Sequence, residues 1–296
     1  MSVAKVELGR RLFYDVRLSG NGTQACSSCH QQKLAFTDGR AHALGSTGES
    51  HPRSAMSLVN AAYGASLTWV GTDHRTLEDQ MLVPLLGDHP VEMGLKGREG
   101  ETLARLRPDP VYSKLFSDAF PSGGDPVSLR NVRRAIAAFE RTIIAADSPY
   151  DRLVWNDDRA ALSDGARRGM ALFFSERLAC SKCHAGFVFS GPSAWEGVKV
   201  PEPRLEDNGL GGLSRVPTLR NVAVTAPYMH DGRFASLEDV VDHYARGGTP
   251  SPGRSPLVRG FAVTDGEKRD LVEFLKCLTD DRLLTDPAFA DPWKGE

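Results

Sequence analysis

The sequence predicts a mainly α-helical protein built from two related domains with long loops. Three observations support this prediction: apolar residues recur at helical spacing, one set of motifs occurs twice in the same order, and no segment shows sustained strand alternation. The 296 residues leave room for two modest domains. Hydrophobic residues make up 41% of the chain and charged residues 25%, which excludes a disordered or low-complexity protein.

Helix signals are clearest in two segments. Leu129–Ile144 carries apolar residues at helical spacing, with Arg and Glu between them. Thr264 and Glu267 form a capping box, which predicts a helix that begins there and runs to Leu278. In contrast, residues 187–217 are rich in Gly and Pro and have no period, which predicts a long loop.

The chain contains one set of motifs twice, about 160 residues apart, and this period has the size of a domain. Asp147-Ser148-Pro149 lies between the copies, so we expect domains at residues 1–147 and 148–296, facing each other about a pseudo-twofold axis. The matching positions are Gly9, Leu12 and Phe13 with Gly169, Leu172 and Phe173; Leu58, Asn60 and Ala62 with Leu219, Asn221 and Ala223; and the candidate N-caps Thr76 and Ser236 with the Leu-Glu-Asp strings that follow them.

Four of the five cysteines fall into two C-x-x-C-H motifs, which begin at residues 26 and 180. This motif is typical of covalent haem c attachment, in which each thiol forms a thioether and the His becomes the proximal iron ligand. A thioredoxin-type pair would lie in a βαβ pattern, and a four-thiolate zinc site would leave both histidines unused. We therefore expect two cytochrome c-type haem domains, with the haems bound through Cys26, Cys29, Cys180 and Cys183 and the irons through His30 and His184.

Charge and hydropathy restrict the compartment and the partners. The net charge of −2, from 36 Lys and Arg against 38 Asp and Glu, gives no footprint for nucleic acid. No apolar run approaches the roughly 18 residues of a membrane-spanning helix. Thioether attachment of haem takes place outside the cytoplasm, so we expect a periplasmic protein. The first residues lack the apolar core of a signal peptide, and we expect that a leader has been removed.

The two copies differ where a second axial iron ligand would come from. Tyr244 lies six residues after Glu238, and Pro84 lies six residues after Glu78. Tyrosine can ligate haem iron, whereas proline has no donor atom. If this segment faces the haem in both halves, the second iron is six-coordinate and the first is open to peroxide or oxygen. His243 is the alternative sixth ligand, and Met229 is a weaker candidate.

The chain resembles bacterial dihaem cytochrome c peroxidases over nearly its whole length. Ordinary family members carry a Met at the position of Tyr244, and a Tyr there is similar to the MauG branch. The strings at Thr76–Gln80 and His89–Gly94 most resemble the methanobactin-associated MbnH type of that branch. The other strings that carry the resemblance are the G-x-x-L-F-Y-D-x-R-L opening, both haem motifs, Trp69, Gln80, Pro84, Glu92, Leu219-Arg220-Asn221-Val222 and Pro227-Tyr228.

The resemblance implies roles for four residues near the haems. Glu92 and Gln80 match the family's residues at the open haem face. A carboxylate with a raised pKa suits the proton transfer of peroxide cleavage, and an amide can orient the peroxide. Pro84 would keep the sixth position of the first iron free. Trp69 would lie between the haems and carry an electron from one to the other.

Two further features of the family match this chain only in part. Ordinary members carry a His that blocks the first haem, but the matching loop at residues 44–47 has none. The family also binds calcium, which is a candidate third cofactor here. Thr225 and Pro227 match its carbonyl donors, whereas Ser54 stands where the family has an Asn side chain.

The resemblance therefore implies a dihaem peroxidase that reacts with hydrogen peroxide and stores its oxidising equivalents as a bis-Fe(IV) state. By the MbnH resemblance, these equivalents convert a tryptophan of a small periplasmic copper-binding partner protein to kynurenine. The alternative is a cytochrome c peroxidase that reduces peroxide to water with electrons from a small cytochrome c or cupredoxin. A non-catalytic electron carrier would need two six-coordinate irons, against which Pro84 argues.

Overall fold

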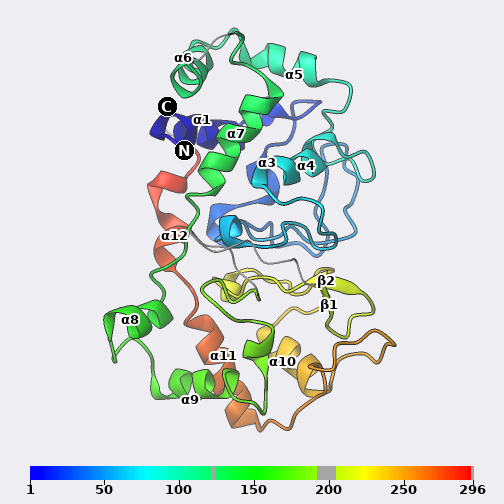
Figure 1. Cartoon of the computed structure of the whole chain (residues 1–296), viewed down its shortest axis with the longest axis vertical. Helices are drawn as coiled ribbons and strands as arrows, with labels where there is room; N and C mark the ends of the chain where they lie inside the picture. The colour runs from blue at the N-terminus through cyan, green and yellow to red at the C-terminus, as the bar shows by residue number, and fades with distance from the viewer. Residues whose placement is uncertain (122–123, 192–204, 295–296) are drawn as a thin grey trace.

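The computed structural model describes residues 1–121, 124–191 and 205–294. The longer α-helices are α1 (Val3–Phe13), α5 (Glu99–Leu106), α6 (Pro110–Ala119), α7 (Leu129–Glu140), α8 (Pro149–Asn156), α9 (Asp164–Phe173), α10 (Leu237–Ala245) and α11 (Asp265–Lys276). The short ones are α2 (Cys26–Cys29), α3 (Leu77–Gln80), α4 (Leu82–Leu86) and α12 (Asp281–Thr285). Figure 1 shows α1 and α5–α7 at one end of an elongated molecule and α8–α11 at the other. The mainly helical class is confirmed in the described residues.

The same helix pair occurs in each half of the chain. Helix α1 packs on α7 in the first half, and α9 packs on α11 in the second. A Cβ atom added at Gly9 would lie 1.9 Å from the Ala135 carbonyl oxygen, and one at Gly169 would lie 1.9 Å from that of Asp270. Only glycine therefore allows either pair to approach so closely, because any side chain at these positions would meet backbone.

The predicted helix caps are present. The side chains of Thr76, Ser236 and Thr264 each accept a hydrogen bond from the backbone N–H three residues later, at the start of α3, α10 and α11. Helix α7 begins where predicted but ends at Glu140, four residues before the expected end. The Thr142 hydroxyl donates to the Phe139 carbonyl (2.6 Å), which satisfies a terminal carbonyl where the chain leaves the helix.

Two matching asparagines fix the chain after the helices α7 and α11. Asn60 and Asn221 both adopt left-handed backbone conformations, with φ of 57° and 58°. The Asn60 backbone N–H donates to the Ile143 carbonyl, and its side-chain amide bonds to both backbone groups of Ala145. The Asn221 N–H donates in the same way to Leu278, and its side chain bonds to both backbone groups of Asp280. The sequence duplication therefore extends to buried hydrogen bonds.

The apolar side chains form two hydrophobic cores, one in each half. Helices α1, α6 and α7 dominate the first core, and α9, α10 and α11 dominate the second. The C-terminal segment does not follow this division, because Leu283 of α12 is buried in the first core and Trp293 packs against it. The boundary after residue 147 stays a prediction, as does the pseudo-twofold axis, and residues 281–293 connect the two halves.

The segment at residues 187–217 is not a continuous loop. It contains an antiparallel hairpin of β1 (Leu205–Asp207) and β2 (Leu213–Arg215), while residues 192–204 lie outside the described part. Gly209 and Gly211 have positive φ and reverse the chain between the strands. The expectation of a loop was wrong here because two three-residue strands are too short to show alternation.

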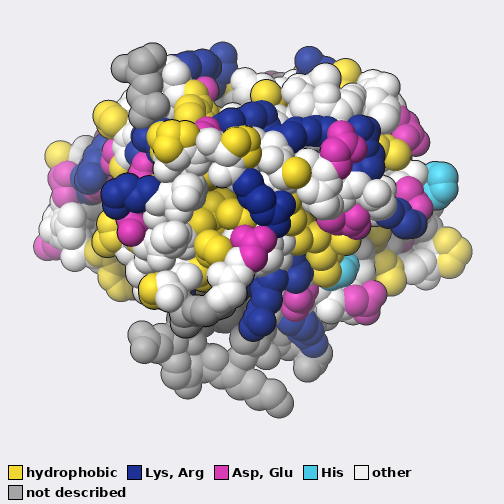
Figure 2. Space-filling view, turned by 90° about the horizontal axis from the view of Figure 1, so that it is seen from above, with side chains coloured by type: hydrophobic (Ala, Val, Ile, Leu, Met, Phe, Trp, Pro, Cys, Tyr) yellow, Lys and Arg dark blue, Asp and Glu magenta, His cyan; other side chains and the backbone are white. Residues whose placement is uncertain are grey.

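Two further observations concern the charge on the surface and the length of the apolar helices. Figure 2 shows basic and acidic side chains interspersed on one end of the molecule, without a face of a single sign in this view. Among the described residues, no helix is long and apolar enough to cross a membrane.

Candidate functional site

Each half contains a large cavity beside its C-x-x-C-H motif. Cys26, Cys29 and His30 line the first cavity, which encloses about 1690 Å³ of empty space including its open mouth. Cys180 and His184 line the second cavity, of about 1380 Å³. Each motif therefore faces a cavity in which a bound group could lie.

Each motif folds into a single turn, which places Cys26, Cys29 and His30 on the wall of the first cavity and Cys180 and His184 on the wall of the second. In the first motif, α2, the His30 N–H donates to the Cys26 carbonyl (3.0 Å). In the second, the His184 N–H donates to the Cys180 carbonyl (2.9 Å). All four thiols are free of disulfide bonds and are available for covalent attachment.

Both motif histidines are held in the form that binds iron. Nδ1 of His30 donates to the Phe36 carbonyl (2.8 Å), and Nδ1 of His184 donates to the Phe189 carbonyl (3.0 Å). Burial lowers the pKa of both imidazoles, which favours the neutral form. A neutral ring with its proton on Nδ1 has its lone pair on Nε2, and the Nδ1 bond fixes the ring orientation as in many metal sites.

Tyr244 on α10 lines the second cavity together with His184, whereas His243 does not belong to the described lining. Nε2 of His243 instead bonds to the Asn208 carbonyl (3.2 Å), and its ring packs between Phe234 and Tyr244. Burial raises the pKa of Tyr244 to about 12, although the Asn208 side chain lowers it in part. Of the two neighbouring candidates, the geometry favours Tyr244. The weaker candidate, Met229, also lines this cavity.

The first cavity brings together Gln80, Pro84 and Glu92 with His30. Helices α3 and α4, which carry Gln80 and Pro84, correspond to the single helix α10 of the second half. Pro84 accounts for this break, because its ring would clash with the carbonyl of Gln80 in a continuous helix. Burial raises the pKa of Glu92, whose Oε1 lies 3.9 Å from Nε2 of His51.

Trp69 lines both cavities. Its indole N–H donates to the Ser54 carbonyl (2.9 Å), which fixes the ring, and its own carbonyl accepts from the Arg215 N–H (2.9 Å). Ser54 and Arg215 also border both cavities. Trp69 therefore borders both candidate haem sites, and its role between the haems stays a prediction.

The candidate calcium donors lie on the second cavity. Thr225 and Pro227 line it, as does Ser54, which occupies the position of the family's Asn. The Ser54 hydroxyl is engaged with the Met229 carbonyl at 3.3 Å. No group of three or more His, Cys, Asp or Glu side chains suited to a metal ion occurs in the described residues. Calcium stays a prediction.

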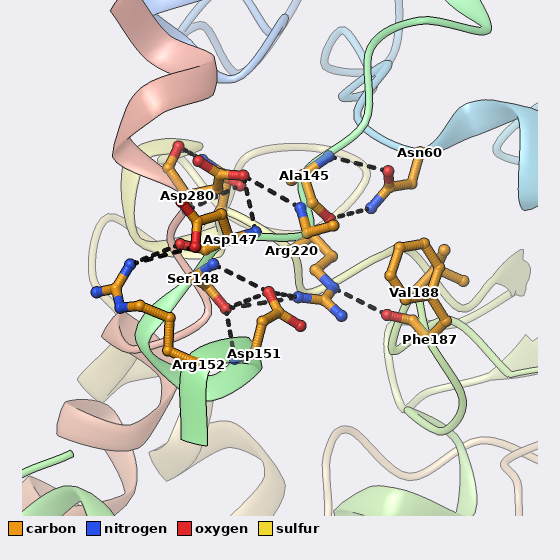
Figure 3. Close-up of polar contacts among 12 residues, drawn as sticks. Asn60, Ala145, Asp147, Ser148, Asp151, Arg152, Phe187, Val188, Arg220 and Asp280 are labelled. Atoms are coloured by element: carbon orange, nitrogen blue, oxygen red, sulfur yellow. Dashed lines mark hydrogen bonds and ion pairs between the residues drawn. The ribbon is translucent and has the colours of Figure 1, made fainter. Parts of the chain in front are cut away.

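The sequence analysis assigned no role to two charged residues at the cavities. Arg220 is 1% exposed, and its guanidinium pairs with Asp151 (2.5 Å) and donates to the Phe187 carbonyl (2.8 Å), as Figure 3 shows. These contacts connect the loop after His184 to helix α8. The second residue is Glu140, which is 7% exposed on the wall of the first cavity. Burial raises the pKa of its carboxyl to about 8.

The residues present fit a covalently held haem in each cavity. The first cavity wall carries two thiols and an imidazole, and the second carries the Cys180 thiol and the His184 imidazole, with Cys183 next to His184 in the same turn. In the first cavity, Oε2 of Glu140 is buried and has no hydrogen-bond partner among the described residues. Buried polar atoms without partners are rare in native proteins, and one is expected beside a space that another group fills.

Comparison with known sequences leads to the same cofactor. Residues 3–159, more than half of the chain, match the sequence profile of the di-haem cytochrome c peroxidase family. The methylamine utilization protein MauG of Methylorubrum extorquens is 35% identical over 286 residues, which cover 93% of this chain and 78% of MauG. The cytochrome c551 peroxidase of Pseudomonas aeruginosa is 33% identical over 288 residues, which cover 92% of this chain and 78% of the peroxidase.

Solved structures agree with the sequence comparison. A crystal structure of a MauG-like protein associated with microbial copper homeostasis has a TM-score of 0.95 and 39% identity, covering 99% of this chain and 94% of that one. The diheme peroxidase BthA of Burkholderia thailandensis shares the fold, with a TM-score of 0.74 and 24% identity over 98% of this chain and 90% of BthA.

Proposed function

The chain belongs to the di-haem cytochrome c peroxidase family, and from this premise we propose that it is a MauG-like enzyme with two haems c. It is an oxidoreductase that acts on hydrogen peroxide, as its family and named relatives establish. We propose further that it works in the periplasm and oxidises a residue of a small copper-binding partner protein. The single observation that carries the MauG-like assignment is that Tyr244 and Pro84 hold matching positions on the two cavities.

The first cavity supplies the groups for peroxide cleavage. When bound, the haems supply the irons that react with peroxide and store its oxidising equivalents. Pro84 itself has no donor atom that could bind the iron of a haem held by His30, so its position would leave access for peroxide. Glu92 takes a proton from one peroxide oxygen and delivers it to the other, while the Gln80 amide orients the peroxide. Burial raises the pKa of Glu92, which makes proton return easier than for an ordinary carboxylate.

In this proposal, the haem of the second cavity stores oxidising equivalents and does not bind the substrate. Tyr244 and His184, which line this cavity together, would both bind the iron of the second haem. Burial keeps the free phenol neutral, since its pKa is raised to about 12, but a ferric ion favours the phenolate. A hard anionic oxygen stabilises an oxidised iron better than a thioether does. Trp69, on the wall of both cavities, transfers electrons between the two sites.

The partner is inferred from similarity. A structure 39% identical to this chain belongs to a MauG-like protein associated with microbial copper homeostasis. We therefore propose that the stored equivalents convert a tryptophan of a small copper-binding protein to kynurenine. No residue of this chain identifies that substrate by itself.

The second candidate is a cytochrome c peroxidase that takes electrons from a small cytochrome c or cupredoxin. Relatives that bear the peroxidase name support it at a similar level of identity, 33% for the Pseudomonas aeruginosa enzyme. Tyr244 on the second cavity argues against this candidate, because a high-potential entry haem needs a soft, neutral ligand such as Met.

The experiment compares two reductants for the haem-loaded protein. Peroxide is added with reduced cytochrome c in one arm and with a small periplasmic copper-binding protein of the same organism in the other. Kynurenine in the copper protein, detected by peptide mass spectrometry, supports the proposal. Steady oxidation of cytochrome c with an unmodified copper protein contradicts it and supports the second candidate. The Tyr244→Phe variant is the matched control, because it should lose the kynurenine product.

A further inference from the structure

Glu140 occupies a position on the first cavity that has a direct counterpart on the second. Asn60 hydrogen-bonds to Ile143, and Asn221 hydrogen-bonds in the same way to Leu278. Counting back three residues from each acceptor gives Glu140 and Leu275. Both are buried, and each lines the cavity of its own half. The packing position thus accepts leucine in the second half, and the first half carries a carboxyl group instead.

The charge of Arg141 lowers the pKa of Glu140 in part and that of Glu78 raises it, but burial has the largest effect and raises the pKa. Arg141 follows Glu140 in the chain, and both of its terminal nitrogens donate hydrogen bonds to the Glu78 carboxylate on α3 (2.9 and 2.7 Å). From α2 the facing group is Cys26; burial, and secondarily the Glu140 charge, raises the pKa of its thiol. Oε2 of Glu140 is buried with no partner among the described residues. The other titratable or charged groups along this cavity are Cys29, His30, Glu49, His51, Arg53, Asp73, His74, Glu92 and Arg215.

Burial without a partner favours the neutral acid, and it raises the pKa of Glu140 to about 8. A neutral acid in a cavity of low polarity responds to any positive charge that appears beside it, because the charge stabilises the carboxylate. Loss of an electron from a haem in this cavity adds such a charge. Leu275, in the second cavity, cannot respond in this way.

We propose that Glu140 holds an exchangeable proton beside the haem of the first cavity and releases it when that haem loses an electron. The O–H bond of the carboxyl breaks, its electron pair stays on the carboxylate, and the proton passes to water. The electron passes to the oxidant, which is peroxide in the enzyme or a redox mediator in a titration. The net charge of the cavity is therefore unchanged. This inference rests on the proposed haem of the first cavity, not on its reaction with peroxide.

The test is an anaerobic spectroelectrochemical titration of the dihaem protein at a series of pH values, without peroxide. One proton released per electron lowers the midpoint potential by about 59 mV for each tenfold fall in proton concentration. We expect a slope approaching this value for the haem attached through Cys26 and Cys29. Glu140→Gln and Glu140→Leu should remove most of the slope. The haem of the second cavity is an internal control, because its midpoint potential should not respond to Glu140 when the pH or this residue is changed.

Several results would overturn the proposal. A wild-type potential independent of pH would do so without any variant, so the test holds even if a variant loses its haem. An equal slope in wild type and Glu140→Gln would exclude Glu140 as the source. A slope that disappears in Glu92→Gln but persists in Glu140→Gln would assign the released proton to Glu92. The titration involves no peroxide, so failure of the proposed function would be seen separately.

Discussion

Pro84 of α4 and Tyr244 of α10 occupy matching positions, six residues after Glu78 and Glu238, and each lines the cavity of its own half. The duplicated helix pairs and the paired hydrogen bonds of Asn60 and Asn221 make this comparison meaningful, since the two halves share a local framework. One half therefore offers an oxygen donor where the other offers none. In the proposed function, this difference separates a site that binds peroxide from a site that stores oxidising equivalents.

Replacing Tyr244 with Phe should convert the haem of the second cavity from low spin to high spin. The phenol oxygen is the proposed sixth ligand, and Phe removes it while keeping the ring. EPR spectra of the ferric protein measure this change. Tyr228→Phe is the matched control, because Tyr228 lines the same cavity and should leave the spectrum unchanged. An unaltered spectrum in Tyr244→Phe would mean that another residue, such as Met229, binds the iron.

Replacing Glu92 with Gln should slow the reaction with peroxide by roughly 10²- to 10⁴-fold, the usual contribution of a positioned acid–base group. Burial raises the pKa of Glu92, and only the carboxylate accepts a proton from peroxide. The wild-type rate should therefore fall as the pH falls through a value above the usual range of glutamate. The variant should lack this dependence in stopped-flow measurements. A similar loss in Asp73→Asn, also on the first cavity, would argue against a specific role for Glu92.

Replacing Trp69 with Phe should slow electron exchange between the two haems without changing either spin state. The indole lies on the wall of both cavities and is oriented by its bond to Ser54. Rapid-scan spectra after peroxide addition should show the first haem reacting before the second in the variant. Trp155→Phe serves as control, because Trp155 is 70% exposed on α8. Equal behaviour of the two variants would remove Trp69 from the electron path.

Replacing Gly9 with Ala should destabilise the folded protein by about 1–3 kcal/mol, as overpacking of tight contacts does. The added Cβ would lie 1.9 Å from the Ala135 carbonyl oxygen, so α1 and α7 would have to separate. Gly100→Ala on α5 meets nothing within 4 Å and should stabilise the protein by about 0.4–1 kcal/mol. Denaturant unfolding of the haem-loaded proteins measures both. Equal stabilities would show that the close approach of α1 and α7 is not required.

The local features of the site could be predicted from the sequence. Cys26 to His30 form one helical turn, so the spacing alone places the thiols and the imidazole on one wall. Thr76 and Ser236 cap their helices through residues only three positions away. Pro84 breaks its helix through a clash within the same turn. In each case the determining contacts lie within four residues of the chain.

Features that depend on distant residues could not be predicted in this way. In the sequence, Glu140 is one of several charged residues of α7. Only the packed structure shows that it is buried on a cavity wall. Arg220 pairs with Asp151, 69 residues away. Leu283 lies in the second half of the sequence but in the first hydrophobic core. Motif spacing carries no information about such pairs.

The EPR spectrum of the ferric, haem-loaded protein tests the central claim most directly. If Tyr244 binds the second iron and Pro84 leaves the first one open, the spectrum contains one low-spin and one high-spin haem in equal amounts. Two low-spin signals would mean that a protein ligand fills the position beside Pro84, and two high-spin signals would mean that Tyr244 binds no iron. Either result would contradict the division of roles between the two cavities.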